Sequence, residues 1–243
     1  MFEITDLHNH SLCGLDDGAD SYETMCDMLR VSYDNGVRCI CFTPHYNNNA
    51  HGDDCTLTEI MASYQLAREY CDKCLPGMRL YVGSEMLYHF DCIDSIADKK
   101  LFTVANSRYV LTDFYKTPDA RSIILGLERL LNCGYIPIVA HIERYPCLFG
   151  RIDDIRRMSM LGAVIQINAA SLFGGLMSKS RRQCLKLLAE EIVDVVASDA
   201  HNLSTRSPEL KKAAEFVISK FGNKYAERIF HDNPERIISD GRL

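Results

Sequence analysis

The 243-residue sequence contains no long run of Lys and Arg, no apolar run near 18 residues, and no Gly/Ser/Pro-rich linker. Without a basic run, the net charge of -6 argues against nucleic acid as a partner, since clustered cations must neutralise its phosphates, although a local basic pocket is compatible with the sequence. The absence of a long apolar run argues against membrane insertion. The absence of a linker predicts a single domain over residues 1–243.

Several catalytic motifs are also missing. None of the eleven cysteines is followed by Arg six positions later, as the phosphate-binding loop of a cysteine phosphatase requires. A G-x-S-x-G nucleophile elbow and a G-x-x-x-x-G-K-[ST] phosphate loop are absent too. These absences exclude the corresponding covalent and nucleotide-binding chemistries.

The cysteines are scattered and odd in number, and the N-terminal MFEITDLHNH does not resemble a secretory signal. We therefore expect reduced thiols and a cytoplasmic location. Cys71 and Cys74 form a lone C-x-x-C in a segment of helical pattern, without the second pair of a zinc ribbon. A structural role is expected for them.

Short apolar runs alternate with longer amphipathic segments along the whole chain, which is the βαβ pattern. Predicted strands cover residues 2–7, 37–43, 79–83, 109–112, 136–140, 163–167 and 192–197. Helices are predicted to begin at Thr117-Pro118, Ser207-Pro208 and Asn233-Pro234, and to end near Gly36, Gly134 and Gly162. The pattern predicts an α/β fold with a parallel sheet that is closed or nearly closed.

Metal-ligand residue types follow six of the seven predicted strands. They are His8 and His10, His45, Glu85, Asp113, His141, and Asp199 with His201. In a parallel barrel all these strand ends meet on one face. The remaining histidines, His51, His89 and His231, are expected at the surface or in loops.

The spacing of His8 and His10 allows both imidazoles to bind one ion, because residues i and i+2 of a strand point to the same side. Three carboxylates and five imidazoles in one pocket would otherwise force carboxylates to become protonated. The mixed N/O ligand set suits Mn, Fe or Zn better than Ca, and we expect two or three divalent ions.

Two arginines follow the histidines of this set: Arg144 three residues after His141, and Arg206 five residues after His201. Guanidinium groups beside a metal cluster indicate an anionic, phosphoryl substrate. The alternative is that either arginine only pairs with the neighbouring carboxylates.

At these positions the sequence resembles the polymerase and histidinol phosphatase (PHP) superfamily, and especially its capsule-biosynthesis CpsB/CapC branch of bacterial protein-tyrosine phosphatases. The matching runs are DLHNHSLCGLDDGA at 6–19, TPHY at 43–46, VGSEM at 82–86, VLTDF at 110–114, AHIERY at 140–145, QINAASLFG at 166–174 and SDAHN at 198–202. They extend in family order over nearly the whole chain.

The resemblance implies a distorted (β/α)7 TIM-like barrel, a trinuclear centre often supplied with manganese, and hydrolysis of phosphotyrosine on a bacterial tyrosine kinase. The implied ligand sets are His8, His10, Glu85 and Asp199 for one metal, Glu85, Asp113 and His141 for a second, and Asp17, His45 and His201 for a third. Arg144 and Arg206 match the phosphate-binding arginines of the family. Asp17 is preferred to Asp16 on the family pattern alone.

The main departure from the family is Asp113, where the family usually has Glu followed by Phe and Pro, and this chain continues with Phe114 and Tyr115. The shorter carboxylate predicts weaker binding of the second metal. His141 is followed by Ile142 instead of the usual Pro, which affects only the stiffness of the loop.

Three alternatives to the tyrosine phosphatase remain at this point. One is a phosphatase acting on histidinol phosphate or another small phosphomonoester, and one is an amidohydrolase-like metal hydrolase, which would leave the paired arginines unexplained. The third is a non-enzymatic barrel that keeps metals for stability or docking. The sequence is compatible with a homo-oligomer but does not predict the oligomeric state.

Overall fold

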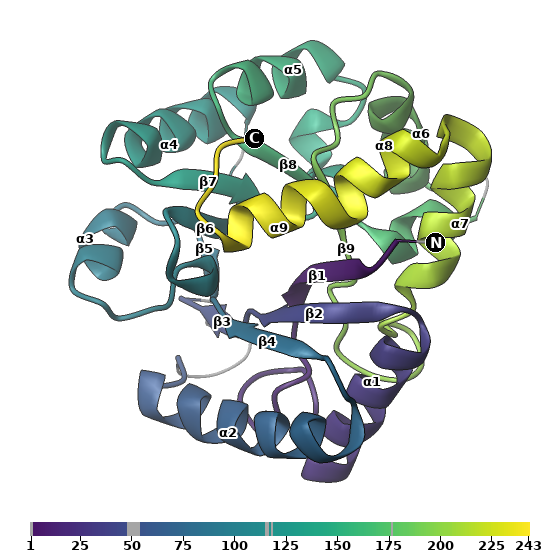
Figure 1. The fold of residues 1–243 in the computed structure, drawn as a ribbon. Helices are drawn as coiled ribbons and strands as arrows, with labels where there is room; N and C mark the ends of the chain where they lie inside the picture. Colours follow the sequence, from purple (N-terminus) through teal and green to yellow (C-terminus); the bar gives the residue numbers. More distant parts are fainter. Residues whose placement is uncertain (1, 48–53, 115–116, 118, 176) are drawn as a thin grey trace.

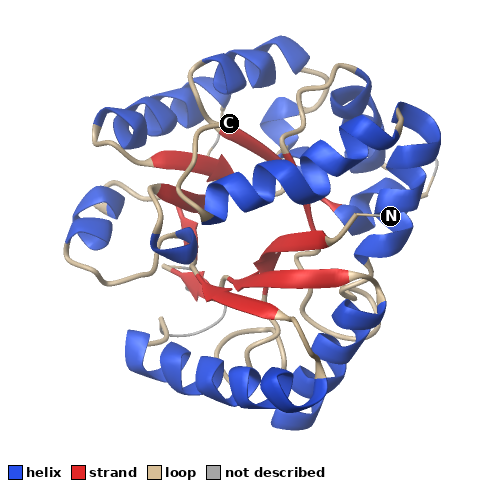
Figure 2. Ribbon diagram, viewed as in Figure 1, coloured by secondary structure: helices blue, strands red, loops and turns tan. Residues whose placement is uncertain are grey.

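The structure is a computed structural model that describes residues 2–47, 54–114, 117, 119–175 and 177–243. Central strands are surrounded by helices (Figures 1 and 2). The strands are β1 (Ile4–Asn9), β2 (Val37–Phe42), β3 (His45–Tyr46), β4 (Arg79–Val82), β5 (Glu85–Leu87), β6 (Tyr109–Asp113), β7 (Ile136–Val139), β8 (Val164–Asn168) and β9 (Val195–Ala197). The α-helices are α1 (Tyr22–Asp34), α2 (Leu57–Cys74), α3 (Cys92–Ala97), α4 (Ala120–Asn132), α5 (Ile152–Met160), α6 (Lys179–Ala189), α7 (Leu210–Phe221), α8 (Asn223–Glu227) and α9 (Asn233–Ile238).

All pairings between these strands are parallel, in the orders β1-β2-β4 and β3-β5-β6-β7-β8-β9. Two of the nine described strands, β3 and β5, are short continuations of β2 and β4 after a bend. The two sheets therefore form one ring of seven strand positions, each matching a predicted strand. The predicted distorted (β/α)7 barrel is confirmed.

The bends lie at Pro44 and Gly83. Pro44 has no N–H to donate to a sheet, and its carbonyl accepts the N–H of Glu85 at 3.0 Å. A Cβ on Gly83 would lie 3.2 Å from Cα of Val104 and 3.3 Å from Sγ of Cys41, so the close packing here favours glycine. The sequence-based prediction extended both strands to these bends and did not separate the short continuations.

The ring closes between β1 and β9, where Asn9 and Ala200 form an isolated parallel bridge. The buried carboxylate of Asp6 accepts hydrogen bonds from the Ser198 N–H at 2.9 Å and the Ser198 hydroxyl at 2.6 Å. Burial raises the pKa of Asp6, although these hydrogen bonds oppose the rise. The first and last strands are thus connected just before the segments that carry the candidate ligands.

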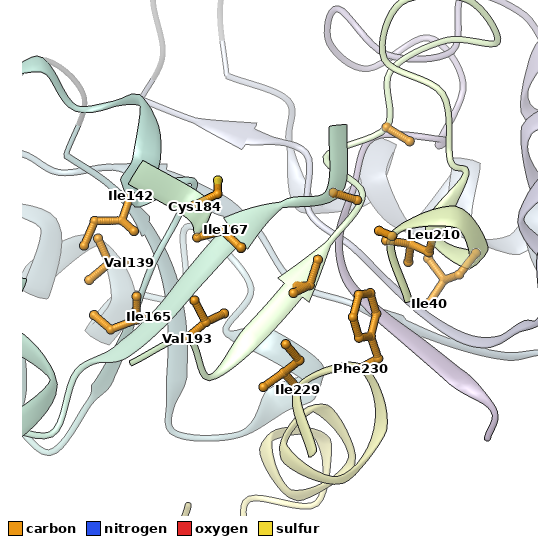
Figure 3. Packing of buried hydrophobic residues seen from close by; sticks show 14 of the residues in the cluster. Ile40, Val139, Ile142, Ile165, Ile167, Cys184, Val193, Leu210, Ile229 and Phe230 are labelled. Carbon is orange, nitrogen blue, oxygen red and sulfur yellow. The ribbon is translucent and has the colours of Figure 1, made fainter. Parts of the chain in front are cut away.

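Apolar side chains fill both the inside of the barrel and the layer between strands and helices. Ile40, Ile165 and Ile167 belong to the outer cluster, together with Ile229 and Phe230 from the C-terminal helical segment (Figure 3). A second cluster, inside the barrel, contains side chains from six strands and Ile237 of α9. The strand ends are consequently held on a packed core.

The C-terminal helical stretch crosses the end of the barrel opposite the carboxyl ends of the strands (Figure 1). Glu235 of α9 pairs with Arg79 at the start of β4, and the carbonyl of Gly241 accepts the hydroxyl of Tyr109 at the start of β6, at 2.7 Å. This end of the barrel is therefore covered, and the other end is left for chemistry.

The predicted helix ends are confirmed at Gly36, Gly134 and Gly162, all with positive φ. Among the predicted starts, that at Asn233-Pro234 is confirmed, since α9 begins at Asn233, although Asp232 before it is already helical and closes the π-helical segment η6 (Arg228–Asp232), so Asn233 is not a cap. The helix α7 begins two residues after Ser207-Pro208, and α4 begins after its cap Asp119, while Pro118 lies outside the described residues.

All eleven cysteines lie in the described part of the chain and are free. Cys71 is buried and Cys74 exposed at the end of α2, and neither belongs to a group of three or more candidate metal ligands among the described residues. No helix in the described ranges is long and apolar enough to cross a membrane.

Candidate metal centre

The nine predicted ligand side chains converge at the carboxyl ends of the strands. They are His8 and His10 on and just after β1, Asp17 in the following loop, His45 on β3, Glu85 on β5, Asp113 at the end of β6, His141 after β7, and Asp199 with His201 after β9. His141 and Asp199 have φ values of 31° and 52°. This left-handed backbone is strained in residues other than glycine, and it turns the chain immediately after each strand.

The two histidines of the H-x-H motif direct ring nitrogens at each other. Nδ1 of His10 lies 2.8 Å from a carboxylate oxygen of Asp16, and Nδ1 of His8 lies 3.3 Å from the amide oxygen of Gln166. If each Nδ1 carries the proton for these acceptors, both Nε2 atoms present lone pairs. These Nε2 atoms are 3.2 Å apart, an arrangement that a shared cation would stabilise.

Glu85 lies at the middle of the cluster and is 1% exposed. Its Oε2 is 3.3 Å from Nε2 of His8, 3.4 Å from Nε2 of His10 and 2.9 Å from Nδ1 of His45. Its Oε1 is 2.8 Å from Nε2 of His141. A carboxylate with histidines on both oxygens has the arrangement needed to bridge two ions.

A second group of donors forms around Asp17. Its Oδ1 lies 3.3 Å from Nε2 of His45 and 3.1 Å from Nε2 of His201. Nδ1 of His201 lies 2.9 Å from the carbonyl of Asp199, so in the tautomer that donates this bond Nε2 carries a lone pair facing the carboxylate. Apart from its approach to Asp17, the buried Nε2 of His201 has no polar partner among the described residues. A cation between Nε2 of His201 and Oδ1 of Asp17 would satisfy both atoms.

Asp113 forms a third group with Glu85 and His141, whose ligand atoms lie within 4.8 Å of one another. The hydroxyl of the fully buried Tyr145 donates to Oδ1 of Asp113 at 3.2 Å and accepts the N–H of Phe114 at 2.8 Å. The shorter side chain at position 113 thus reaches the group, and Tyr145 holds it there.

Asp199 is held by side chains on both oxygens. Its Oδ1 is 2.8 Å from Arg206, and its Oδ2 is 2.9 Å from Arg144 and 2.6 Å from the amide of Asn168. Arg206 also lies 3.3 Å from Asp17. Both arginine side chains keep about a third of their surface exposed, at 36% and 30%, so they form the boundary between the buried carboxylates and solvent.

The pKa values of the histidines show that the cluster favours positive charge. Burial would lower the pKa of His45, but the charge of Glu85 and the hydrogen bond with Asp17 raise it to about 11. Burial likewise opposes the rise in the pKa of His141, which its bond to Glu85 brings to about 9. Burial and the neighbouring His10 lower the pKa of His201 to about 4. Without metal, protons on His45 and His141 balance the carboxylates, and divalent ions would replace those protons.

The model of the family described as "Capsular polysaccharide synthesis, CpsB/CapC" matches residues 4–239. The chain belongs to this CpsB/CapC family. It is 32% identical over 242 residues to tyrosine-protein phosphatase CpsB of Streptococcus pneumoniae, covering 98% of this chain and 99% of the relative. It is 27% identical over 221 residues to tyrosine-protein phosphatase YwqE of Bacillus subtilis strain 168, covering 91% and 86% respectively.

Solved structures give the same family. Crystal structures of YwqE from Bacillus subtilis and CpsB from Streptococcus pneumoniae, described as unique metal-dependent tyrosine phosphatases, include a chain that matches with a TM-score of 0.89 at 25% identity, covering 99% of this chain and 96% of that one. An organophosphorus hydrolase from Deinococcus radiodurans matches with a TM-score of 0.63 at 12% identity, covering 97% and 92%. The second likeness supports the barrel fold alone.

The grouping differs in two respects from the sets implied by the resemblance. His10 lies in the group of Asp17, His45 and His201 as well as beside His8 and Glu85. Asp199 is 3.4 Å from His8 but is also engaged by both arginines, the pairing left open as an alternative. The assignment of each residue to one ion therefore remains a prediction.

Several residues that orient the cluster in this CpsB/CapC member were not predicted. Asp16 orients His10, and Gln166 accepts the backbone N–H of His141 at 2.7 Å besides contacting His8. Asn168 binds Asp199 and accepts the amide of Gln166 at 2.8 Å. The sequence contained a signal for Gln166 and Asn168. These two amide residues stand at i and i+2 at the end of β8, the one strand that no predicted ligand follows.

The remaining histidines lie outside the three ligand groups. His89 is partly buried beside α3, and His231 is partly buried in η6, not in a loop. His51 lies outside the described residues, as does most of the polar loop at 46–54.

Tyr145→Phe should weaken metal binding at the Asp113 group. Loss of the hydroxyl removes the group that orients Asp113, and such changes cost about 10–100-fold in metal affinity or activity. Tyr109→Phe is the matched control, because its hydroxyl binds Gly241 at the opposite end of the barrel. Metal titration followed by calorimetry measures the difference, and equal affinities in the two variants would contradict the role of Tyr145.

Proposed function

We propose that this CpsB/CapC-family chain is a metal-dependent protein-tyrosine phosphatase of the phosphoric-monoester hydrolase class. The observation that carries the proposal is the convergence of nine ligand-type side chains beside two partly exposed arginines. The names of the relatives, tyrosine-protein phosphatases CpsB and YwqE, supply the substrate class. Residues 1–243 would act as one domain, since the family model spans 4–239.

The donor set fits two or three divalent ions, with Mn preferred and Fe or Zn as alternatives, because imidazole and carboxylate ligands are mixed. The residues that would hold them are His8, His10, Asp17, His45, Glu85, Asp113, His141, Asp199 and His201. Bound divalent ions would supply an activated water near neutral pH and neutralise phosphate charge.

The protein side chains contribute binding and orientation. Arg144 and Arg206 offer planar guanidinium donors that match phosphate oxygens, and both lie where the buried cluster meets solvent. Asp199 fixes both guanidinium groups, so the phosphate-binding donors are preorganised. Asp16 and Gln166 hold the imidazole tautomers that leave Nε2 free to bind a cation.

A bacterial tyrosine kinase is the proposed protein partner, and the proposed setting is capsule or exopolysaccharide synthesis, following the description of the family. A cytoplasmic location belongs to the same proposal. It is supported by eleven unpaired cysteines, which persist as thiols in a reducing compartment.

The test compares three substrates: a phosphotyrosine peptide, histidinol phosphate and a dipeptide. With Mn added, the peptide should be hydrolysed with the highest kcat/KM, and chelation should abolish this activity. Preference for histidinol phosphate would support a small-molecule phosphatase on the same barrel. Cleavage of the dipeptide alone would instead support an amidohydrolase-like enzyme and overturn the proposal.

A further inference from the structure

The exposed face of α6 is basic in a chain that is acidic overall. Lys179, Arg182 and Lys186 are exposed and lie at i, i+3 and i+7, on one side of the helix. The ion pairs between described residues include none of these three side chains; nearby Arg151 and Arg156 pair with Asp154 and Glu190. Three unneutralised cations in a protein of net charge -6 indicate a local anion-binding surface.

These cations border a hollow of about 300 Å³, which we call the basic groove. It is lined by Phe149, Gly150, Lys179, Arg182, Gln183 and Lys186. Gln183, only 4% exposed, holds the opposite wall in place by accepting the N–H of Gly150 at 3.1 Å and donating to the carbonyl of Leu148 at 3.0 Å. The groove is therefore a fixed concave surface with an aromatic ring and no carboxylate in its lining.

The basic groove lies near the candidate metal centre. Its wall belongs to the segment that follows Arg144, and α6 contacts the short helix η3 (Ile142–Arg144) directly. Gly150 is six residues after Arg144, so an extended chain between them covers at most roughly 20 Å. A peptide whose phosphotyrosine lies at Arg144 needs about six further residues to reach the groove.

We propose that the basic groove binds an acidic segment of the substrate protein, within about six residues of the phosphotyrosine. The inference rests on the proposed function and adds a preference for acidic flanking sequence. A concave groove bordered by cations fits an extended chain with Asp and Glu side chains better than it fits a flat anionic membrane. Charges at the edge of an interface act mainly on encounter and specificity, so the effect should appear in KM.

The test uses Lys179→Glu/Lys186→Glu, with Lys73→Glu/Lys220→Glu as the control. The control residues are exposed on α2 and α7 and change the net charge equally. Substrates are p-nitrophenyl phosphate and two phosphotyrosine peptides, one flanked by Asp and Glu and one by Ser. The groove variant should raise KM for the acidic peptide about tenfold. Its kcat, and KM for the other two substrates, should stay unchanged.

An unchanged KM for the acidic peptide, or an equal rise in the control variant, would overturn the inference. It would also be overturned if the groove variant lost binding to phosphatidylserine vesicles while KM for the acidic peptide stayed the same. If the unsubstituted protein hydrolyses no phosphotyrosine substrate, the proposed function fails instead. Fluorescence anisotropy of the labelled acidic peptide then tests the groove independently, with weaker binding expected for the groove variant only.

Discussion

Glu85→Gln should reduce kcat for phosphotyrosine-peptide hydrolysis by more than about 100-fold, the upper range for loss of residues that merely orient ligands. Gln retains the shape of Glu85 but loses the negative charge that four histidines surround. Since this carboxylate belongs to two of the three ligand groups, its neutralisation should release metal from both. Steady-state kinetics with added Mn measures the loss.

Metal-dependent stabilisation separates loss of metal from loss of fold. Ions that bind only the folded state raise Tm, so Mn should raise the Tm of the unsubstituted protein and raise that of Glu85→Gln much less. Glu69→Gln, on the exposed face of α2, is the control and should keep both activity and the Mn-dependent rise. Full activity in Glu85→Gln would show that the bridge is not needed.

Arg144→Ala should lower kcat/KM by about 100- to 1,000-fold while leaving the metal content unchanged, and Arg206→Ala should do the same. A charged donor aimed at a reacting group typically has an effect of this size. Arg144→Lys should restore little, because an ammonium lacks the planar pair of donors that a guanidinium offers to phosphate oxygens. Inhibition by inorganic phosphate should weaken in parallel.

The same experiment decides whether the arginines only neutralise Asp199. If the arginines only neutralise Asp199, the variants would lose metal or stability. Any weakening of inhibition by phosphate would then be explained by the loss of metal. Arg156→Ala is the control, since Arg156 pairs with Glu190 at the surface and should affect neither property. Elemental analysis of each variant therefore accompanies the kinetics.

The strands were predictable because a buried parallel strand appears in the sequence as an apolar run with polar residues at its end. The breaks between β2 and β3 and between β4 and β5 could not be predicted. They depend on a hydrogen bond to the Pro44 carbonyl and on the packing of Val104 against Gly83. The start of α9 at Asn233 was predicted correctly, but the local capping signals did not reveal that the π-helical segment η6 already precedes it.

Eight of the nine candidate ligand residues could be predicted from their place after the strands, but the choice between Asp16 and Asp17 could not. Both follow the same strand, and only the fold shows Asp16 bonded to His10 while Asp17 faces His45 and His201. The sequence left a local basic pocket open but did not locate the basic groove. Its cations are separated by helical spacing, and its wall comes from a distant segment near Gly150.

The most direct test of the central claim is elemental analysis of the protein purified without added metal, followed by activity measurement before and after chelation. The account predicts two or three divalent ions per chain, loss of phosphotyrosine hydrolysis when they are removed, and recovery when Mn is returned. A metal-free protein that hydrolyses phosphotyrosine at an undiminished rate would contradict it.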